Sequence, residues 1–190
     1  MSADYADVRT TMVDSQVRTQ DVTDLAIQDA MRAVPREALL PPEKSFLAYA
    51  DTELEYAPGR WMLRPRGVAK LLQGLAPRAG ERVLAIAEPY AAAVLERMGL
   101  NVERLEAGDL KSVSGGPYDL IVCEGAVTKA PAAWTAALAS GGRLGVVERD
   151  GPVGRAMLYL KSDGALGERP LFDCTPPIMA GFEAERGFAL

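Results

Sequence analysis

The sequence predicts an α/β fold in which helices cover a mostly parallel sheet. Strand-length and helix-length apolar segments alternate between Val83 and Glu148, as in doubly wound α/β proteins. The run Leu120–Cys123 is continuously apolar, which is typical of a strand buried on both faces of a parallel sheet. The 190 residues are 48% hydrophobic and 25% charged, enough for a sizeable core. We expect a single domain over 1–190, with an N-terminal helical segment at 1–78 and the α/β core at 79–190.

In the first third of the chain, the sequence pattern predicts helices followed by a stretch without regular structure. A helix is expected over 8–17. Apolar residues at helical spacing between Ile27 and Val34 predict a second, with Thr23 as its N-cap. The stretch 49–58 suits irregular chain or short strands, and a third helical stripe lies at 68–75.

The remaining elements follow from apolar runs and the turn residues between them. Strands are expected at 83–87, 101–105, 118–123 and 143–148. Helices are expected from Pro89 to Gly99 and over 131–139. The tail predicts an antiparallel hairpin of 156–161 and 169–173 around Asp163-Gly164, and a last short strand at 187–190.

Composition excludes several classes of function. The chain has no histidine, so Ser–His–Asp and Cys–His hydrolases and His-containing zinc sites are ruled out. The net charge of −5 argues against nucleic acid as a partner. Cys123 and Cys174 lack metal-ligand spacing, and Cys123 is expected to be a small buried hydrophobe rather than a catalytic thiol. No signal peptide or membrane span is visible, which predicts a cytoplasmic protein without membrane contact or metal.

Several motifs in order resemble the protein-L-isoaspartate O-methyltransferase family. They are Met12-Val13…Gln16, Val34-Pro35-Arg36-Glu37, Ala48-Tyr49-Ala50-Asp51, Gly80-Glu81-Arg82-Val83-Leu84, Tyr118-Asp119-Leu120-Ile121-Val122 and Gly141-Gly142-Arg143-Leu144. The resemblance covers nearly the whole chain. It implies a Rossmann-like class I methyltransferase fold that binds S-adenosylmethionine and methylates the carboxylate of isoaspartyl residues. A carboxylate is already a nucleophile at neutral pH. This reaction therefore requires alignment of the reactants and exclusion of water, and it does not require an imidazole base.

The loop that would hold the cofactor departs from the family pattern. The positions that match the family site are Ala87, Glu88, Tyr90 and Glu106, and none is glycine. Family members have a glycine-rich turn here, because glycine allows positive φ and close backbone approach. Pro89 removes one backbone N–H from the helix start. Glu88 is interpreted as a structural cap in preference to a ligand. These positions therefore predict that no S-adenosylmethionine is bound.

Two further departures concern the adenine and the methyl acceptor. The stretch 107–116 is too short for a crossover helix and a strand, so one helix–strand unit is expected to be missing. Leu63 stands where the family has a hydroxyl residue that bonds the isoaspartyl group, and leucine cannot donate a hydrogen bond. Asp51 matches the family's acidic residue and is the remaining catalytic candidate, with a cap or turn role equally favoured.

The segment Arg60–Arg66 carries three arginines and an apolar group. Local ion pairs or a solvated face are favoured for the arginines, and a grip on an anionic partner is the alternative. Trp61 and Trp134 are expected in the core or at its rim. The residues Tyr56, Trp61, Met62 and Leu63 could instead form an apolar patch that a partner covers.

Three functions remain open from the sequence. The first, which we favour, is a degenerate family member that has lost cofactor binding and catalysis and serves as a binding or regulatory module, with another protein as partner. The alternative is an active S-adenosylmethionine-dependent protein carboxyl methyltransferase that repairs isoaspartyl residues. A remodelled cleft that binds a different small ligand is the third.

Overall fold

The centre of the molecule is a mixed sheet. Residues 5–87 and 89–184 are described in the computed structural model, and within them the sheet has six strands in the order β4-β3-β5-β6-β7-β8. The strands are β3 (Arg82–Ile86), β4 (Asn101–Leu105), β5 (Tyr118–Val127), β6 (Leu138–Arg149), β7 (Gly154–Ser162) and β8 (Ala165–Asp173). The first four in this order pair in parallel and the last three antiparallel. The α/β fold with a parallel core and a C-terminal antiparallel hairpin is confirmed.

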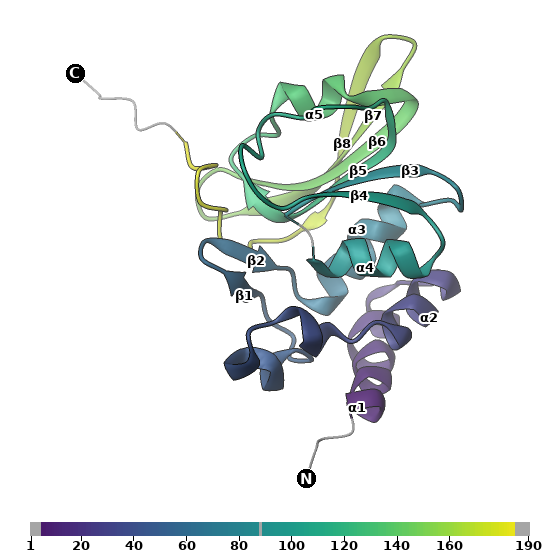
Figure 1. The fold of residues 1–190 in the computed structure, drawn as a ribbon, viewed down its shortest axis with the longest axis vertical. Coiled ribbons are helices and arrows are strands. Elements are labelled where there is room, and N and C mark those ends of the chain that lie inside the picture. The colour runs from purple at the N-terminus through teal and green to yellow at the C-terminus, as the bar shows by residue number, and fades with distance from the viewer. Residues whose placement is uncertain (1–4, 88, 185–190) are drawn as a thin grey trace, which may run out of the picture.

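Helices cover both faces of this sheet (Figure 1). They are α1 (Tyr5–Met12), α2 (Leu25–Ala33), α3 (Pro65–Leu75), α4 (Pro89–Arg97) and α5 (Ala132–Ala136). In Figure 1, α3 and α4 lie below the sheet with α1 and α2 beneath them, and α5 lies above it. A small ribbon of β1 (Leu54–Ala57) and β2 (Arg60–Met62) stands beside the sheet.

Strand alternation divides the core into two layers. Val83 and Val122 face the layer that holds α3, α4 and the N-terminal helices. Their neighbours Leu84 and Cys123 face the other layer, where Trp134 packs against Phe182. Successive side chains of a strand point to opposite faces, so a continuously apolar strand fills both layers. Glu124 follows Cys123 on β5 and so points into the layer of the N-terminal helices.

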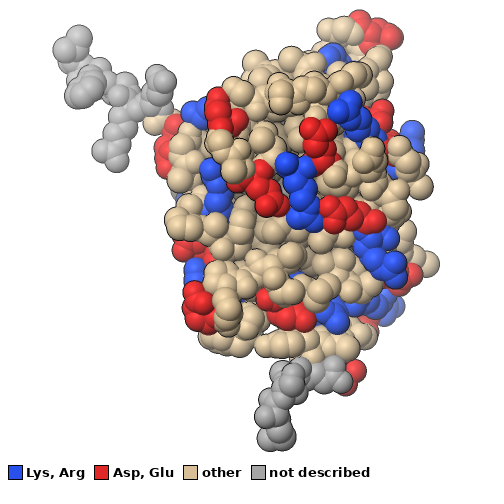
Figure 2. Space-filling view, in the orientation of Figure 1, with Lys and Arg blue, Asp and Glu red and all other residues tan. Residues whose placement is uncertain are grey.

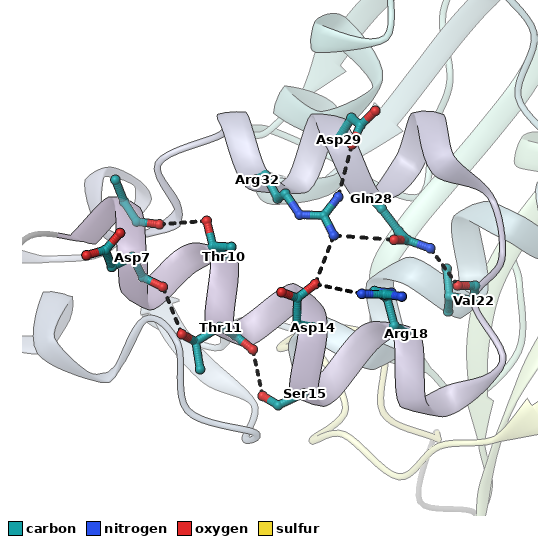
Figure 3. A network of polar contacts seen from close by, with 11 residues as sticks. Asp7, Thr10, Thr11, Asp14, Ser15, Arg18, Val22, Gln28, Asp29 and Arg32 are labelled. Atoms are coloured by element: carbon teal, nitrogen blue, oxygen red, sulfur yellow. Dashed lines mark hydrogen bonds and ion pairs between the residues drawn. The ribbon is translucent and has the colours of Figure 1, made fainter.

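The N-terminal helices are tied together by a polar network (Figure 3). α1 continues into a π-helical turn at Val13–Val17. The carboxylate of Asp14 in this turn accepts hydrogen bonds from Arg32 at 3.0 Å and Arg18 at 3.3 Å. These two bonds, the Arg32 bond first, lower the pKa of Asp14. Arg32 belongs to α2, so Asp14 connects the first helical stretch to the second.

Several element boundaries differ from the expected ones. The N-cap of α2 is Asp24 rather than Thr23, because the Asp24 carboxylate accepts from the N–H groups of Ala26 and Ile27. The stretch after Pro41 is partly helical, with a 3₁₀ turn at Pro42–Leu47 before β1. β5, β6 and both hairpin strands are longer than predicted. The expected strand at 187–190 lies outside the described residues, and the single domain over 1–190 stays a prediction.

The chain between β4 and β5 has neither a helix nor a strand in residues 106–117, all of which are described. Within the described sheet β4 pairs only with β3 and forms one edge. Its central residues Glu103 and Arg104 are exposed and charged, which is a common protection of a sheet edge. The prediction that this stretch is too short to form a crossover helix and a strand agrees with the structure. No helix among the described residues is long and apolar enough to cross a membrane.

Gly154 at the start of β7 has no room for a side chain. A Cβ at this position would lie 2.3 Å from the backbone oxygen of Cys174. We expect Gly154→Ala to lower the free energy of unfolding by about 1–3 kcal/mol, because backbone must move. Gly167 in β8 is the matched control, since its Cβ would meet only the Leu160 oxygen at 3.9 Å. Gly167→Ala should change stability by about 0.5 kcal/mol or less in urea unfolding. Equal losses in both variants would contradict this packing.

Candidate functional site

The candidate site lies at the carboxyl ends of the parallel strands β3, β4 and β5. Ligands of open α/β sheets bind in the crevice outside these strand ends, against the N-terminus of the following helix. Here the helix is α4, whose first turn carries Tyr90 and Ala91. Both residues are at most 1% exposed to solvent. The first turn of α4 is therefore packed against the protein itself at this edge of the sheet.

Ala87 directly follows β3 in a conformation that favours glycine. Its φ is 51°, in the left-handed region, which costs a residue with a Cβ roughly 1–2 kcal/mol. Its N–H donates to the carbonyl of Leu105 at 3.0 Å, and its side chain is buried. The turn before α4 therefore holds a buried methyl group in a strained backbone conformation. Glu88 lies outside the described residues.

Glu124 is a fully buried carboxylate on β5, 0% exposed. Its Oε1 accepts from the backbone N–H of Leu63 at 3.1 Å, and its Oε2 accepts from the N–H of Ala91 at 3.3 Å. Ala91 is the third residue of α4, so its N–H is one of those a helix leaves without an internal partner. The positive end of the helix dipole also favours a carboxylate there. An internal side chain therefore holds the anion position at the start of α4.

Arg36 is the cation of this buried cluster and is also 0% exposed. Its Nε donates to the carbonyl of Ala48 at 2.9 Å and its Nη2 to that of Leu63 at 2.6 Å. Its Nη1 lies 3.9 Å from Glu124 Oε1, and its guanidinium carbon lies 4.5 Å from the centre of the Tyr90 ring. Burial lowers the pKa of Arg36, and the Glu124 carboxylate opposes this shift. We name Arg36, Tyr90 and Glu124 the Arg36 cluster.

A second set of motif residues surrounds Tyr49. Its hydroxyl donates to the Glu37 carboxylate and accepts from Arg9 Nη1 at 3.3 Å. Its backbone carbonyl accepts from Gln16 Nε2 at 2.8 Å. Burial and then the Glu37 hydrogen bond raise the pKa of Tyr49, so the phenol stays protonated at neutral pH. The motifs that carry the family resemblance thus bind one another.

Unpartnered polar atoms concentrate in the same region. Among the described residues, four buried side-chain atoms have no hydrogen-bond partner: Arg9 Nε, Gln16 Oε1, Arg36 Nη1 and Tyr90 Oη. An unmade hydrogen bond of a buried group costs about 1–3 kcal/mol. Such groups are rare in native proteins, and a cluster of them is expected at a site rather than in a simple core.

Of the other predicted site residues, Asp51 and Glu106 pair with arginines outside the Arg36 cluster, whereas Leu63 contacts the cluster through its backbone. Asp51 is in an exposed bend, where its carboxylate lies 3.4 Å from Arg66 Nε. Glu106 is exposed and pairs with Arg104 at 3.3 Å. Leu63 is buried and contributes backbone groups only to these polar contacts.

Two of the arginines of 60–66, Arg64 and Arg66, make local ion pairs, and Arg60 donates to the carbonyl of Ala180. Arg64 holds both carboxylate oxygens of Glu53, at 2.6 and 2.7 Å. The expected apolar patch is wrong, because Met62 and Leu63 are both fully buried. Trp134 lies in the core as expected.

Sequence reasoning missed Glu124. The signal was available: one acidic residue directly follows the apolar run Leu120–Cys123 and precedes Gly125-Ala126. A charge inside a stretch that is buried on both sides must find partners. Those partners lie 61 and 33 residues away along the chain, so no local pattern names them.

The relatives found by sequence comparison have the same name, protein-L-isoaspartate O-methyltransferase. No family model matches the chain. The chain is 34% identical to the protein-L-isoaspartate O-methyltransferase of Methylorubrum extorquens (strain PA1), over 85% of this chain and 82% of that protein. It is 30% identical to a protein of the same name from Methanoregula boonei, over 84% and 86%. The alignment with the Methylorubrum protein spans 188 positions but includes only 85% of this chain. The difference consists of gaps in this chain, so parts of that relative have no counterpart here.

Solved structures agree on the fold. A Plasmodium falciparum protein of that name, solved in complex with S-adenosyl-L-homocysteine, matches with a TM-score of 0.73 at 14% identity, over 90% of this chain and 97% of that one. A second protein-L-isoaspartate O-methyltransferase matches with a TM-score of 0.70 at 22% identity, over 92% of this chain and 65% of its own. At these identities the likeness shows the fold and no more.

Arg36 should be far more important to stability than an exposed arginine. We expect Arg36→Met to lower the free energy of unfolding by about 3–5 kcal/mol, because it leaves the Glu124 carboxylate buried without a cation. Arg104 is the control, since it also holds both oxygens of a carboxylate, that of Glu96, but at the surface. Arg104→Met should cost about 1 kcal/mol or less. Urea unfolding of both variants measures the difference, and similar losses would contradict a buried pair.

Both cysteines should be unreactive in the folded protein. Cys123 is buried as predicted, and burial raises the pKa of its thiol and of the Cys174 thiol to about 12. At pH 8 the reactive thiolate is therefore a very small fraction. Iodoacetamide should leave the native protein unmodified by mass spectrometry and should alkylate both cysteines in urea. Rapid alkylation of Cys123 in the native state would show that the strand ends are open.

Proposed function

We propose that this chain, which belongs to the protein-L-isoaspartate O-methyltransferase family, has lost S-adenosylmethionine binding and catalysis. In this proposal it acts as a binding or regulatory module. One observation carries the proposal. The Glu124 carboxylate takes up the N–H of Ala91 at the start of α4 while paired with buried Arg36. These contacts support the proposal, because ligands of open α/β sheets approach this helix start and here it already has an internal carboxylate.

The residues of this crevice do not fit the cofactor. S-adenosylmethionine carries a carboxylate of its own, and Glu124 would bring a second negative charge against it in a buried site. Like charges at close range in a dry site are strongly unfavourable. The buried methyl group of Ala87 also takes the space that a glycine would leave for close backbone approach.

The far side of the crevice supports the same proposal. A bound adenine needs a wall, and in the family a helix, a strand and a loop follow the second strand of the core. The corresponding residues, 106–117, have no regular element in the described structure. Leu63 adds no hydrogen-bond donor for a methyl acceptor, because its side chain is apolar. Binding, orientation and exclusion of water are what methyl transfer to a carboxylate requires, so the lack of an adenine wall and of an acceptor-binding side chain supports the proposal.

The partner that we propose is another protein. Figure 2 shows basic and acidic side chains interspersed over one face of the molecule. Together with a net charge of −5, this distribution disfavours nucleic acid, which binds to continuous basic surfaces. Arg64 and Arg66 are already engaged in ion pairs, so an anionic partner of these two arginines would have to displace Glu53 or Asp51.

The second candidate is an active carboxyl methyltransferase that repairs isoaspartyl residues. The comparisons favour it over the first, since relatives at 30–34% identity over most of the chain have the methyltransferase name. For this function the Arg36 cluster would have to open, with Glu124 leaving Ala91 and Leu63 when the cofactor enters.

Methyl transfer to an isoaspartyl peptide separates the two candidates. With radiolabelled S-adenosylmethionine at pH 7, we expect no label above that of an enzyme-free blank. The Methylorubrum extorquens relative, assayed with the same peptide, is the positive control. Turnover by this chain that saturates with peptide would establish the second candidate and reject the first.

A further inference from the structure

The Glu124 carboxylate is held by groups from other parts of the chain. Its hydrogen-bond donors are the N–H of Leu63, before α3, and the N–H of Ala91, in α4, while its cation Arg36 comes from a 3₁₀ turn. We propose that these groups form a carboxylate-binding site in which Glu124 is the resident ligand, and that a free small carboxylate takes the site when the Glu124 side chain is removed. The inference rests on the proposed function, in which the same cluster fills the crevice.

The donors would keep their places without Glu124. Two backbone carbonyls fix the Arg36 guanidinium, that of Ala48 at 2.9 Å and that of Leu63 at 2.6 Å. The Ala91 N–H belongs to α4, a helix of nine residues. None of these contacts involves β5. A site whose donors are fixed independently of its ligand is preorganised for that ligand.

The groups around the Glu124 carboxylate are all donors. Arg36 Nη1 is fully buried, has no hydrogen-bond partner among the described residues and lies 3.9 Å from Glu124 Oε1. With the N–H groups of Leu63 and Ala91 it forms a set of donors that an acceptor-only ligand satisfies. A carboxylate is such a ligand and can accept from several donors at its two oxygens.

Charge selects an anion over a neutral molecule. Arg9 has its own carboxylate in Glu37 at 3.5 Å, and Arg64 has Glu53 at 2.6 Å. Glu124 is the carboxylate that faces Arg36, so its removal leaves one buried positive charge uncompensated. Because such a charge is costly, a ligand that restores neutrality should bind and an uncharged isostere should not.

Size selects acetate as the probe. Glu124→Ala keeps Cβ and removes one methylene and the carboxylate, which together have the heavy atoms of acetate. Glu124 accepts at Oε1 from Leu63 and at Oε2 from Ala91. A planar ligand with two oxygens can reproduce this pair of contacts, whereas a spherical halide cannot.

The test is thermal unfolding of the full-length Glu124→Ala protein in sodium acetate against sodium chloride at equal ionic strength and pH 7. We expect a saturable rise in Tm of roughly 3–10 °C at 100 mM acetate, by mass action on the folded state. Acetamide, the neutral isostere, should give no rise. In a labelled sample the amide signals of Leu63 and Ala91 should shift with the same saturation curve.

Three controls keep the inference falsifiable. The wild-type protein and Glu124→Gln, whose sites are filled, should show no difference between acetate and chloride. Glu124→Ser, with a similar void, should respond as the alanine variant does, in case that variant unfolds. Equal effects of acetate, chloride and acetamide would overturn the proposal, as would failure of both small variants to fold in acetate.

This outcome is independent of catalysis in the wild-type chain. Turnover of an isoaspartyl peptide by wild-type protein would reject the proposed function while leaving acetate rescue of Glu124→Ala to be observed. Absence of rescue in an inactive protein would reject the carboxylate site alone.

Discussion

One buried ion pair organises the region where the two halves of the molecule meet. Arg36 and Glu124 are both inaccessible to solvent, and neither charge can be buried without compensation. Arg36 gathers the carbonyls of Ala48 and Leu63, and Glu124 gathers the N–H groups of Leu63 and Ala91. Together they fix the N-terminal segment, the start of α4 and the end of β5 relative to one another. Packing of the apolar layers gives the fold its stability, and this pair fixes how the N-terminal segment joins the sheet.

The same constraint shapes the turn that leads into α4. The turn after β3 has a left-handed backbone at Ala87. At the start of α4, the chain's own Glu124 carboxylate accepts from the N–H of Ala91. Helix termini favour negative charge whatever its source. A side chain that supplies this charge stabilises the start of the helix when no ligand is bound.

Much of the fold could be predicted from local pattern. The strand at 101–105 and the start of α4 at Pro89 agree with the structure, because apolar alternation and proline at a first helical position act within a few residues. Thr23 was taken for the cap in place of Asp24 because both residue types cap helices and only geometry separates them. The short stretch before β5 was correctly expected to contain no crossover helix, since chain length limits what ten residues can form.

The sequence shows which family residues the candidate site lacks, but it does not show which residues contact one another there. The sequence marks Ala87 and Leu63 as departures from the family pattern, and both lie near the start of α4 or the Arg36 cluster. It shows Arg36 only as part of a motif and gives no role to Glu124. The roles of these two residues depend on each other and on partners 12 to 61 residues away, and periodicity does not identify such contacts. Asp51 and Glu106, the acidic residues that local reasoning selected, turn out to be exposed and paired with arginines.

Calorimetric titration of S-adenosyl-L-homocysteine into the wild-type protein tests the central claim most directly, because it measures occupancy of the crevice without requiring turnover. If the Arg36 cluster fills the crevice, the titration gives only heats of dilution at ligand concentrations up to the millimolar range. A saturable heat with a micromolar Kd and one site per chain would contradict the claim, because it would show that the cofactor site is open.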